Sequence, residues 1–283
     1  MENETQNLFV IKADGGREPF DEAKLRDSIR RVGANDEDID AVISQVTREM
    51  HGGMTTRKIY QRVFSLLKKM HRPTAARYTL RRAIRELGPS GFPFEKYVGE
   101  LLKAKGYEVA TDMIIQGWCV DHEVDVSARK DGRHVIVECK FHNEEGYKTD
   151  LKVALYVYQR FLDIQKRHET LTGVENEKVH EIWLVTNTKL TSKAIQFASC
   201  AGLTVVAWDY PKPGCLHDLI NETRLHPLTV LTTLSSNDKR LLMENGVILC
   251  RDLPAKKEVM HGIGMDDKKI EKVLAEVGAL HSI

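Results

Sequence analysis

The sequence is poor in cysteine pairs and in long apolar runs. Its five cysteines are scattered and form no C-x-x-C pair. We therefore expect neither a disulfide framework nor a zinc ribbon, and a reducing cytosol is the expected compartment. No apolar run approaches the roughly 20 residues that a membrane span needs, and residues 1–6 lack the basic start of a signal peptide. These absences predict a cytoplasmic protein with no membrane partner.

Positive charge is concentrated in one stretch of the chain. The formal net charge is only +1, yet residues 57–85 contain ten lysines and arginines and no acid. Such a block attracts phosphates, whether those of a nucleotide or those of DNA. The alternative is a basic helix face that is merely solvated.

Breaks in the residue pattern predict an α/β multidomain protein of three modules. Residues 8–88 begin with a hairpin at 8–18 and continue as helices at about 21–31, 37–50, 56–70 and 74–87. The linker Gly88-Pro-Ser-Gly-Phe-Pro sets the first boundary. Residues 91–222 form a mixed α/β layer module, and residues 223–283 form a small helical unit.

The middle module is predicted to follow the order α-β-β-β-α-β-α-β. Its expected helices cover about 94–106, 149–168 and 192–201, and its expected strands cover 107–116, 119–128, 134–141, 181–186 and 202–208. Asp131-Gly132 separates two of these strands, and Asp-Gly between apolar alternations is a strong hairpin signal.

This hairpin places acidic residues together. If Asp131-Gly132 is the two-residue loop, Asp125 lies directly opposite Glu138, and Glu123 lies opposite Lys140. Glu138 and Lys140 are two residues apart and therefore share a face. Because facing like charges destabilise a strand pair, the pattern favours a cation between the acids. Carboxylate oxygens suit Mg²⁺.

These residues carry a resemblance to a known family. Asp125, followed after a hairpin by Glu138-Cys139-Lys140, resembles the PD-(D/E)XK nucleases, in the Mrr-like restriction endonuclease group. Val124 stands where the motif has proline. The resemblance covers roughly residues 91–210 and includes the opening helix with Glu95.

The resemblance implies roles for individual residues. Asp125 and Glu138 would bind Mg²⁺ or Mn²⁺, with the Cys139 carbonyl as a further ligand. Lys140 would orient or deprotonate the attacking water, or stabilise charge on the phosphate. Glu95 would hold the metal through water. Gln159, on the next helix, matches a position where related nucleases often carry a polar site residue.

Each of these assignments has a simpler alternative. Asp125 and Lys140 could be ordinary surface charges on a half-exposed hairpin, because a lone D…E-x-K pattern also occurs by chance. Glu95 could simply complement the N-terminus of its helix.

The N-terminal module has a resemblance of its own. No G-x-x-x-x-G-K-[ST] motif is present, which excludes a P-loop. Residues 8–88 nevertheless resemble the ATP-cone, the module that regulates ribonucleotide reductases and their repressors. The resemblance rests on three segments: Val10-Ile-Lys-Ala-Asp-Gly-Gly-Arg-Glu-Pro-Phe-Asp-Glu-Ala-Lys-Leu, Thr55-Thr-Arg-Lys-Ile-Tyr60, and Ala75-Ala-Arg-Tyr78 with Arg81.

The cone resemblance implies binding of ATP or dATP as a regulatory ligand. Triphosphate cations would come from Lys12, Lys24 and Arg85, a phosphate or sugar hydrogen bond from Thr56, and packing on the base from Val10. Two positions depart from the family. Ala13 replaces a usual basic residue, and Tyr60 stands at a nucleotide-site position where histidine is common. The alternative is a helical domain whose cations bind the DNA backbone.

The C-terminal unit resembles a single helix-hairpin-helix motif at Met260-His-Gly262-Ile263-Gly264. Its Gly-x-Gly turn would let backbone N–H groups approach a DNA phosphate without reading sequence. A packing or dimerisation unit is the alternative, and homo-oligomer formation is left open.

Together these patterns predict a Mg²⁺-dependent DNA endonuclease regulated by ATP or dATP. The main alternative is a nucleotide-regulated DNA-binding protein with an inactive nuclease fold. A transcriptional regulator like the cone-bearing repressors is disfavoured, because those carry a zinc ribbon. The DNA structure recognised, the cleavage polarity and the oligomer do not follow from the sequence.

Overall fold

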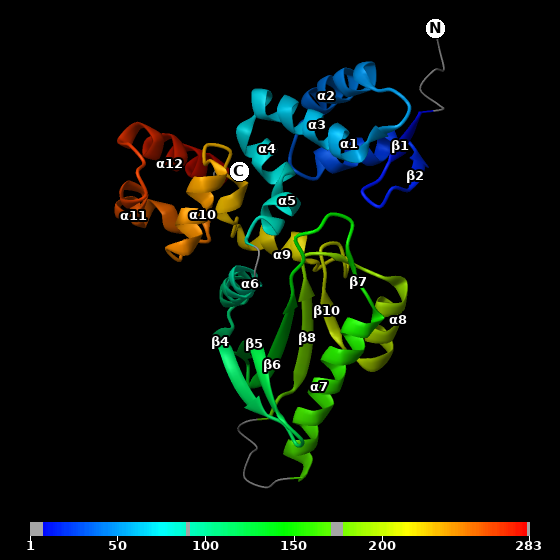
Figure 1. Cartoon of the computed structure of the whole chain (residues 1–283), viewed down its shortest axis with the longest axis vertical. Helices are drawn as coiled ribbons and strands as arrows, with labels where there is room; N and C mark the ends of the chain where they lie inside the picture. Colours follow the sequence, from blue (N-terminus) through cyan, green and yellow to red (C-terminus); the bar gives the residue numbers. More distant parts are fainter. Residues whose placement is uncertain (1–7, 89–90, 171–177, 282–283) are drawn as a thin grey trace. The chain divides into compact units, whose positions relative to one another are not determined.

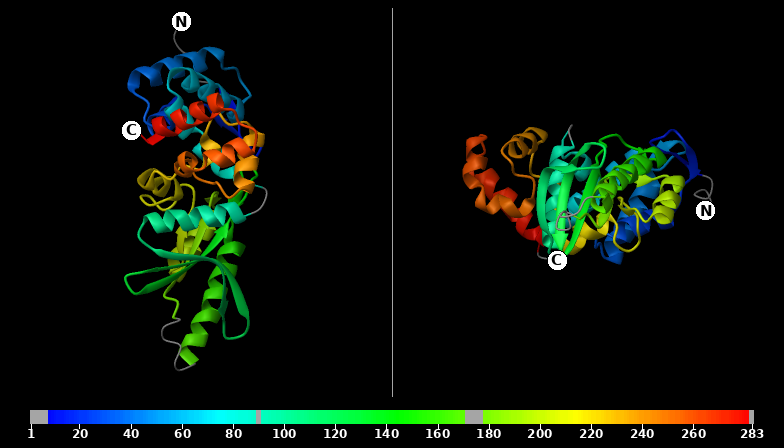
Figure 2. Two further views of the ribbon diagram at one scale, coloured as in Figure 1. Left: turned by 90° about the vertical axis from the view of Figure 1, so that its left-hand side faces the viewer. Right: turned by 90° about the horizontal axis from the view of Figure 1, so that it is seen from below.

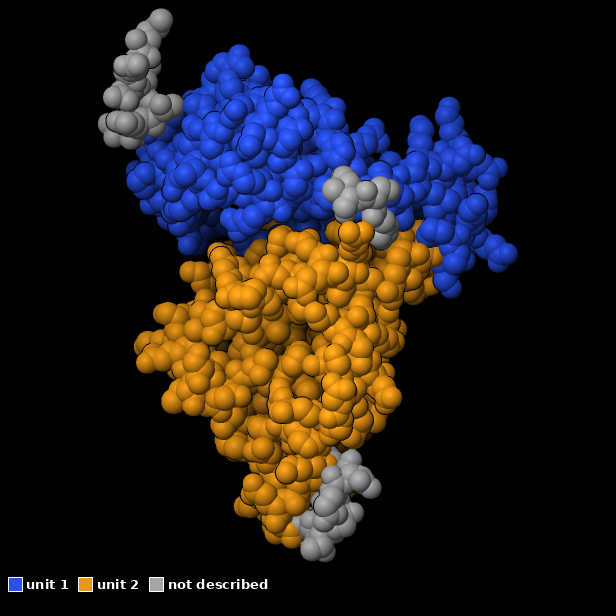
Figure 3. Space-filling view, turned by 180° about the vertical axis from the view of Figure 1, so that it is seen from behind, with its two compact units in different colours: residues 1–83, 230–241, 254–283 blue, residues 84–229, 242–253 orange. Residues whose placement is uncertain are grey.

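The computed structural model of the chain describes residues 8–88, 91–170 and 178–281. The chain divides into two compact units (Figure 3). Unit 1 contains residues 1–83, 230–241 and 254–283, and unit 2 contains residues 84–229 and 242–253. The segment predicted as one C-terminal module therefore contributes to both units, and the three-module division stays a prediction. Within the predicted linker, Pro89 and Ser90 lie outside the described residues.

Unit 1 begins with a small sheet of strand order β2-β1-β3. β1 (Phe9–Ile11) pairs antiparallel with β2 (Arg17–Pro19), as the sequence predicted, and the Asp14 carboxylate accepts a 2.9 Å bond from the Gly16 N–H in their turn. β3 (Met54–Thr55) pairs parallel with β1. This third strand was not predicted, because two residues are too short to show an alternating pattern.

Helices cover this sheet and enclose the first core of unit 1. They are α1 (Glu22–Arg30), α2 (Asp36–Glu49), α3 (Thr56–Met70) and α4 (Arg72–Tyr78), and α5 (Leu80–Arg85) follows after Thr79. Asp21, Asn35 and Thr55 cap the first three helices with their side chains. The core is built from apolar residues of β1, α1, α2, α3 and α4.

The C-terminal residues of unit 1 are helical and use buried carboxylates as anchors. The C-terminal region of the chain contains α10 (Ser236–Glu244), α11 (Lys257–Gly262) and α12 (Asp267–His281), with 3-10 turns at Leu228–Val230 and Cys250–Ala255; α10 and both turns also include residues of unit 2. Glu276 accepts hydrogen bonds from the backbone N–H and the hydroxyl of both Thr232 and Thr233. Four bonds satisfy a carboxylate that would otherwise be costly to bury.

Unit 2 contains a five-stranded sheet of order β10-β8-β6-β5-β4. The strands are β4 (Glu108–Gln116), β5 (Asp121–Lys130), β6 (Arg133–Lys140), β8 (Glu181–Thr186) and β10 (Thr204–Val206). β4, β5 and β6 pair antiparallel, whereas β6, β8 and β10 run parallel. The short strands β7 (Lys148–Thr149) and β9 (Lys189–Leu190) pair separately. The predicted element order is confirmed, with β7 and β9 added.

The helices of unit 2 bury the apolar side chains of this sheet. α6 (Phe92–Ala104) packs against β4, β5 and β6, while α7 (Leu151–Thr170) packs against β8 and against α8 (Ser192–Ala201). α7 runs along the sheet with α8 beside it (Figure 1, Figure 2). α9 (Leu216–Thr223) contacts α6. The main core lies between the sheet and the pair α7–α8.

Candidate active site

The centre of the candidate site is the end of β6, the middle strand of the large sheet. Glu138 and Lys140 lie on the same face, as their spacing predicted, and the Lys140 ammonium contacts Glu138 Oε1 at 2.5 Å. Cys139, between them, is buried. The Glu138 side chain is only 8% exposed, so its charge requires partners inside the protein.

Asp125 is held at this site by a hydrogen bond to the backbone of β6, and not by the predicted pairing with Glu138. The predicted register holds from Lys130↔Arg133 to Val126↔Val137, but the ladder stops before Asp125 and Glu138. The Asp125 carboxylate instead accepts a 2.6 Å hydrogen bond from the Cys139 N–H. The pairing of β4 with β5 is also interrupted at Asp125, opposite Asp112, whose φ is 56°. The predicted direct pairing of the two acids is therefore wrong.

The predicted pairing of Glu123 with Lys140 is not formed either. Glu123 lies on β5 in the segment that pairs with β4, opposite Ile114. The β5–β6 ladder has already ended before this point. The next pair in this register would place the like charges of Asp125 and Glu138 face to face, which disfavours continuation of the ladder.

Glu95 adds a third carboxylate from the first turn of α6. Burial, reinforced by the charges of Asp125 and Asp112, raises the pKa of Glu95 to about 7. A Cβ atom at Gly91 would come within 2.8 Å of Glu95 Oε1, so the glycine leaves room for this carboxylate. Glu95 thus complements the start of its helix and also lies within electrostatic range of the β5–β6 acids.

Burial and a neighbouring carboxylate also act on Asp125. Burial raises the pKa of Asp125 to about 6, the Glu138 charge adds to the rise, and the Cys139 N–H opposes it. Burial opposes the charged form of Lys140, but its hydrogen bond to Glu138 and the nearby carboxylates outweigh this effect, and the net result is a raised pKa. The arrangement favours a protonated Lys140 and leaves Asp125 and Glu95 short of positive charge.

Arg160 of α7 belongs to the site, and the sequence analysis missed it. Its guanidinium donates to Glu138 Oε2 and to the Glu123 carbonyl, and its side chain is 13% exposed. The predicted residue, Gln159, is exposed, and no hydrogen bond of its side chain is found among the described residues.

Helical phase explains this correction at α7. The buried residues are Ala154, Val157, Phe161 and Ile164. At about 100° per residue, Gln159 falls opposite this stripe, whereas Arg160 falls at its edge. The helical pattern could therefore have identified Arg160.

Buried hydroxyls fix the end of the strand that carries Lys140. Thr186 of β8 donates a 2.7 Å bond to the Lys140 carbonyl, and its hydroxyl also contacts those of Thr149 and Thr188. Asn187 accepts from the His142 N–H at 2.9 Å and donates to its carbonyl at 2.7 Å. This network holds the backbone on which the lysine sits.

The oxygen donors at this site are of the kind that a hard divalent cation prefers, but they are not arranged around a common metal position. Carboxylate and carbonyl oxygens are the ligands that Mg²⁺ prefers, and the raised pKa values of Asp125 and Glu95 mark a deficit of positive charge. Among residues 8–88, 91–170 and 178–281, however, no group of three or more His, Cys, Asp or Glu side chains is placed to hold a metal ion. Glu138 is engaged by Lys140 and Arg160 instead.

Two of the residues predicted to bind a nucleotide, Lys12 and Thr56, lie at the same edge of the small sheet of unit 1. β1 and β3 are parallel, with Ile11 opposite Thr55. Lys12 and Thr56, which follow these residues, therefore leave the sheet side by side. α3 begins at Thr56 and has no acid in its first turn, so its N-terminus is suited to an anion.

The other predicted nucleotide residues differ in their surroundings. Lys24 is exposed and lies 3.6 Å from Asp21. The Val10 side chain is buried in the core, so the predicted packing of this side chain on a base is wrong. The Tyr60 ring stacks on Tyr78 at 5.1 Å between centroids.

Arg85 and the rest of the basic stretch are partly engaged inside the protein. Arg85 pairs with Glu145 at 3.4 Å within unit 2, and Arg62 pairs with Glu49 at 2.5 Å within unit 1. These ion pairs engage arginines of the basic stretch that the sequence analysis expected to attract phosphates.

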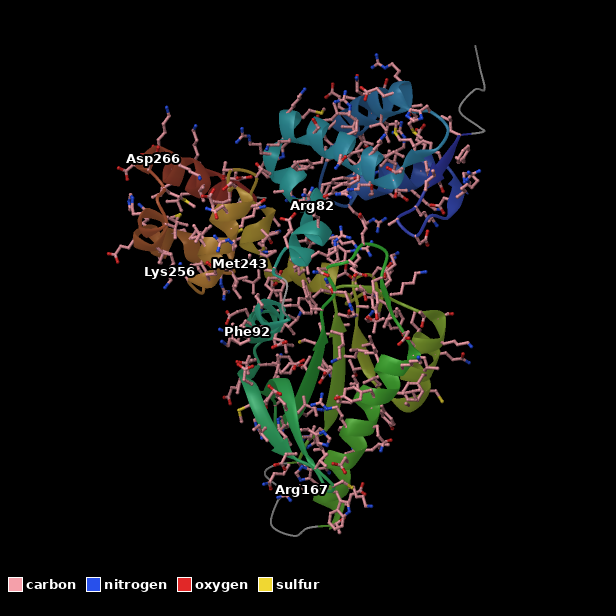
Figure 4. All side chains as sticks on the ribbon, viewed as in Figure 1. Arg82, Phe92, Arg167, Met243, Lys256 and Asp266 are labelled. Carbon is pink, nitrogen blue, oxygen red and sulfur yellow. The ribbon has the colours of Figure 1, made fainter. Side chains whose placement is uncertain are left out.

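The C-terminal Gly-x-Gly segment forms a turn between two helices. Gly264 has φ 88°, and its N–H donates to the His261 carbonyl at 2.9 Å. Asp266 lies at this turn (Figure 4) and accepts a 2.7 Å bond from the Lys269 N–H at the start of α12. An acid at this helix start disfavours a phosphate there.

The structure also bears on membrane insertion. Among the described residues, no helix combines the length and the apolar character that a bilayer span requires.

Three family models match the chain. An ATP cone domain matches residues 8–87, a restriction endonuclease domain matches residues 87–212, and the model described as AF1548-like, C-terminal, matches residues 226–281. The two resemblances that the sequence analysis drew, to the ATP cone and to the restriction endonucleases, are confirmed.

Two proteins with similar chains extend this result. A curated protein of Archaeoglobus fulgidus, described as an uncharacterized protein, is 38% identical over 183 residues, which cover 63% of this chain and 97% of the relative. The solved structure titled "Crystal Structure of Protein of Unknown Function AF1548" is 34% identical with a TM-score of 0.54, and the match covers 67% of this chain and 97% of that one. The chain therefore belongs to the family of this Archaeoglobus fulgidus relative, and it joins an ATP cone domain to a restriction endonuclease domain.

Proposed function

We propose that this protein is a divalent-metal-dependent DNA endonuclease whose activity is regulated by a nucleotide at the cone. The observation that carries the proposal is that Asp125, Glu95 and Glu138 lie within electrostatic range of one another, with Lys140 on Glu138 and with the pKa of Asp125 and Glu95 raised by burial and by the neighbouring carboxylates. Folding alone does not favour such a group of acids, whereas a divalent cation would be held by it and could in turn bind a phosphate substrate.

Each residue of the candidate site would have a separate role in phosphodiester hydrolysis. Asp125 and Glu138 would hold Mg²⁺ or Mn²⁺ with the Cys139 carbonyl, and Glu95 would act through a water. When bound, the metal would supply Lewis-acid activation of the phosphate and of a water nucleophile. Lys140, whose pKa is raised, is suited to orient water and to stabilise charge on the phosphate rather than to accept a proton.

The cone would bind the triphosphate of ATP or dATP at the start of α3. Lys12 and Thr56 leave adjacent parallel strands there, Lys24 is exposed, and the first turn of the helix carries no acid. DNA and nucleotide are thus the proposed partners, and the cytoplasm is the proposed location. Homo-oligomer formation stays open.

The nuclease proposal is tested by cleavage of supercoiled, linear, branched and single-stranded DNA with Mg²⁺. Asp125→Ala and Lys140→Ala should each lower cleavage by at least about 100-fold while DNA binding is kept. Asp121→Ala, which removes an exposed acid from the same strand, is the matched control. Cleavage by either site variant at the wild-type rate would reject the assignment.

One observation favours the alternative, a nucleotide-regulated DNA-binding protein with an inactive nuclease fold. Glu138 is already neutralised by two cations, and within the described residues no three-ligand metal group is assembled. Under this alternative, wild-type protein binds DNA but cleaves none of the four substrates with Mg²⁺ or Mn²⁺.

A further inference from the structure

Arg160 and Lys140 together occupy both oxygens of Glu138. Lys140 Nζ lies 2.5 Å from Oε1. The Arg160 guanidinium donates to Oε2 and, with its other terminal nitrogen, to the Glu123 carbonyl. A metal ion that uses Glu138 as a ligand would lie next to one of these two cations, and the repulsion between the like charges favours release of Glu138 by that cation.

Release of Glu138 by Arg160 would leave strand β6 itself unchanged. Lys140 is two residues from Glu138 on the same strand, and Thr186 holds its backbone at 2.7 Å. Arg160 comes from a different element, α7, on a long side chain with several rotatable bonds. A divalent cation at Asp125 and Glu138 would also repel the guanidinium, because like charges at short range in a poorly solvated site interact strongly.

The Tyr156 ring already lies beside Arg160 in its present position and can hold the guanidinium after release. The exposed Tyr156 ring is 5.6 Å from Arg160 Cζ and 5.8 Å from Lys140 Nζ. A guanidinium stacks well on an aromatic face, and its planar fork matches the oxygens of a phosphate. After leaving Glu138, Arg160 would therefore lie at the solvent side of the site, next to Lys140.

We propose that Arg160 is an exchangeable cation of the nuclease site. In the metal-free protein it neutralises Glu138, on metal binding it yields this carboxylate, and with DNA present it binds the scissile phosphate. The guanidinium stays protonated throughout, so the exchange moves no proton. The inference rests on the proposed metal-dependent cleavage and assigns that reaction a second phosphate-binding cation.

The exchange is tested by two measurements, Mn²⁺ affinity and the rate of DNA cleavage, which we expect to change in opposite directions when Arg160 is replaced. Arg160→Gln should bind Mn²⁺ about tenfold more tightly in a calorimetric titration without DNA, because the competing charged hydrogen bond is gone. The same variant should cleave DNA about 100-fold more slowly at saturating Mn²⁺, because the phosphate loses a cation. Arg160→Lys should recover part of the cleavage. Lys152→Gln, an exposed cation on the same helix, should change neither.

The outcomes that overturn the inference are separate from failure of the nuclease proposal. Unchanged or weaker Mn²⁺ binding by Arg160→Gln would show a structural ion pair, and wild-type cleavage by that variant would exclude a role at the phosphate. If Arg160→Gln fails to fold by circular dichroism, the same two readouts on Arg160→Met, which also removes the charge, decide. Wild-type protein that binds Mn²⁺ without cleaving DNA rejects the nuclease, while the titration still tests the exchange. Absence of Mn²⁺ binding in both proteins overturns the exchange itself.

Discussion

At the scale of single residues, the site is a set of carboxylates that destabilise the metal-free fold. Asp125 has a pKa of about 6 in the folded protein, against about 4 for an unfolded aspartate. Between these two values the folded state binds more protons than the unfolded state, so the free energy of unfolding falls as the pH rises through this window. Glu95, with a pKa near 7, extends the same trend upward.

This linkage predicts that Asp125→Asn stabilises the metal-free protein. At pH 8 with a chelator, the variant should unfold at higher urea concentration, with a gain of about 1–2 kcal/mol after allowance for solvent screening. The gain should shrink as the pH falls from about 6 towards 4, because the folded wild-type carboxyl becomes protonated, and it should be absent well below about pH 4, where the carboxyl is protonated in both states. Asp121→Asn, on the exposed part of β5, is the control. Equal stability of Asp125→Asn and wild type at pH 8 would contradict the proposed repulsion.

At the scale of elements, the end of β6 depends on its parallel neighbour β8. The Thr186 hydroxyl is fully buried and donates to the Lys140 carbonyl, while Asn187 holds both backbone groups of His142. A loop that leaves a strand end has no ladder partner for these groups. The hydroxyl and amide side chains replace the missing ladder and set the position of Lys140.

Thr186→Val should therefore weaken both the fold and the chemistry. The valine keeps the shape but leaves the Lys140 carbonyl without its 2.7 Å donor, at a cost of about 1–3 kcal/mol in urea unfolding. Cleavage should fall further than the loss of folded protein explains, because Lys140 is no longer held. Thr204→Val on β10 changes a half-buried threonine outside this network and should leave cleavage unchanged. Full stability in Thr186→Val would rule out the positioning role.

At the scale of the whole molecule, an ATP cone domain is joined to a restriction endonuclease domain, and the proposed role of the nucleotide is to control cleavage rather than to supply energy for it. The chain has no P-loop to drive a motor. Bound ATP or dATP would act by favouring one state of the protein, with a coupling free energy of about 1–3 kcal/mol. Because coupling is reciprocal, nucleotide should change DNA affinity by the same factor by which DNA changes nucleotide affinity.

Lys12→Ala and Lys24→Ala should each weaken ATP or dATP binding about tenfold and should reduce the modulation of DNA binding in step. The measurements are calorimetric titration of each nucleotide and DNA binding with and without it. Lys69→Ala, at the far end of α3, is the matched control. Tight nucleotide binding with no change in DNA affinity, cleavage or assembly would reject regulation, and no binding at millimolar nucleotide would reject the cone's function.

The sequence by itself determined the local parts of this protein. Asp131 and Gly132 both adopt positive φ, 51° and 74°, and this two-residue turn fixes the β5–β6 register as predicted. Period-two alternation likewise placed Glu138 and Lys140 on one face. These features follow from neighbouring residues, so a short stretch of sequence is enough to specify them.

Only the tertiary structure decided how the parts meet. The break in the ladder at Asp125, the reach of Arg160 to Glu138 and the pairing of β1 with β3 beside Lys12 each join segments far apart in the chain. Such contacts depend on how helices and strands pack and on how buried charges find partners. No local sequence pattern specifies these contacts, because the residues that form them belong to elements that lie far apart in the sequence.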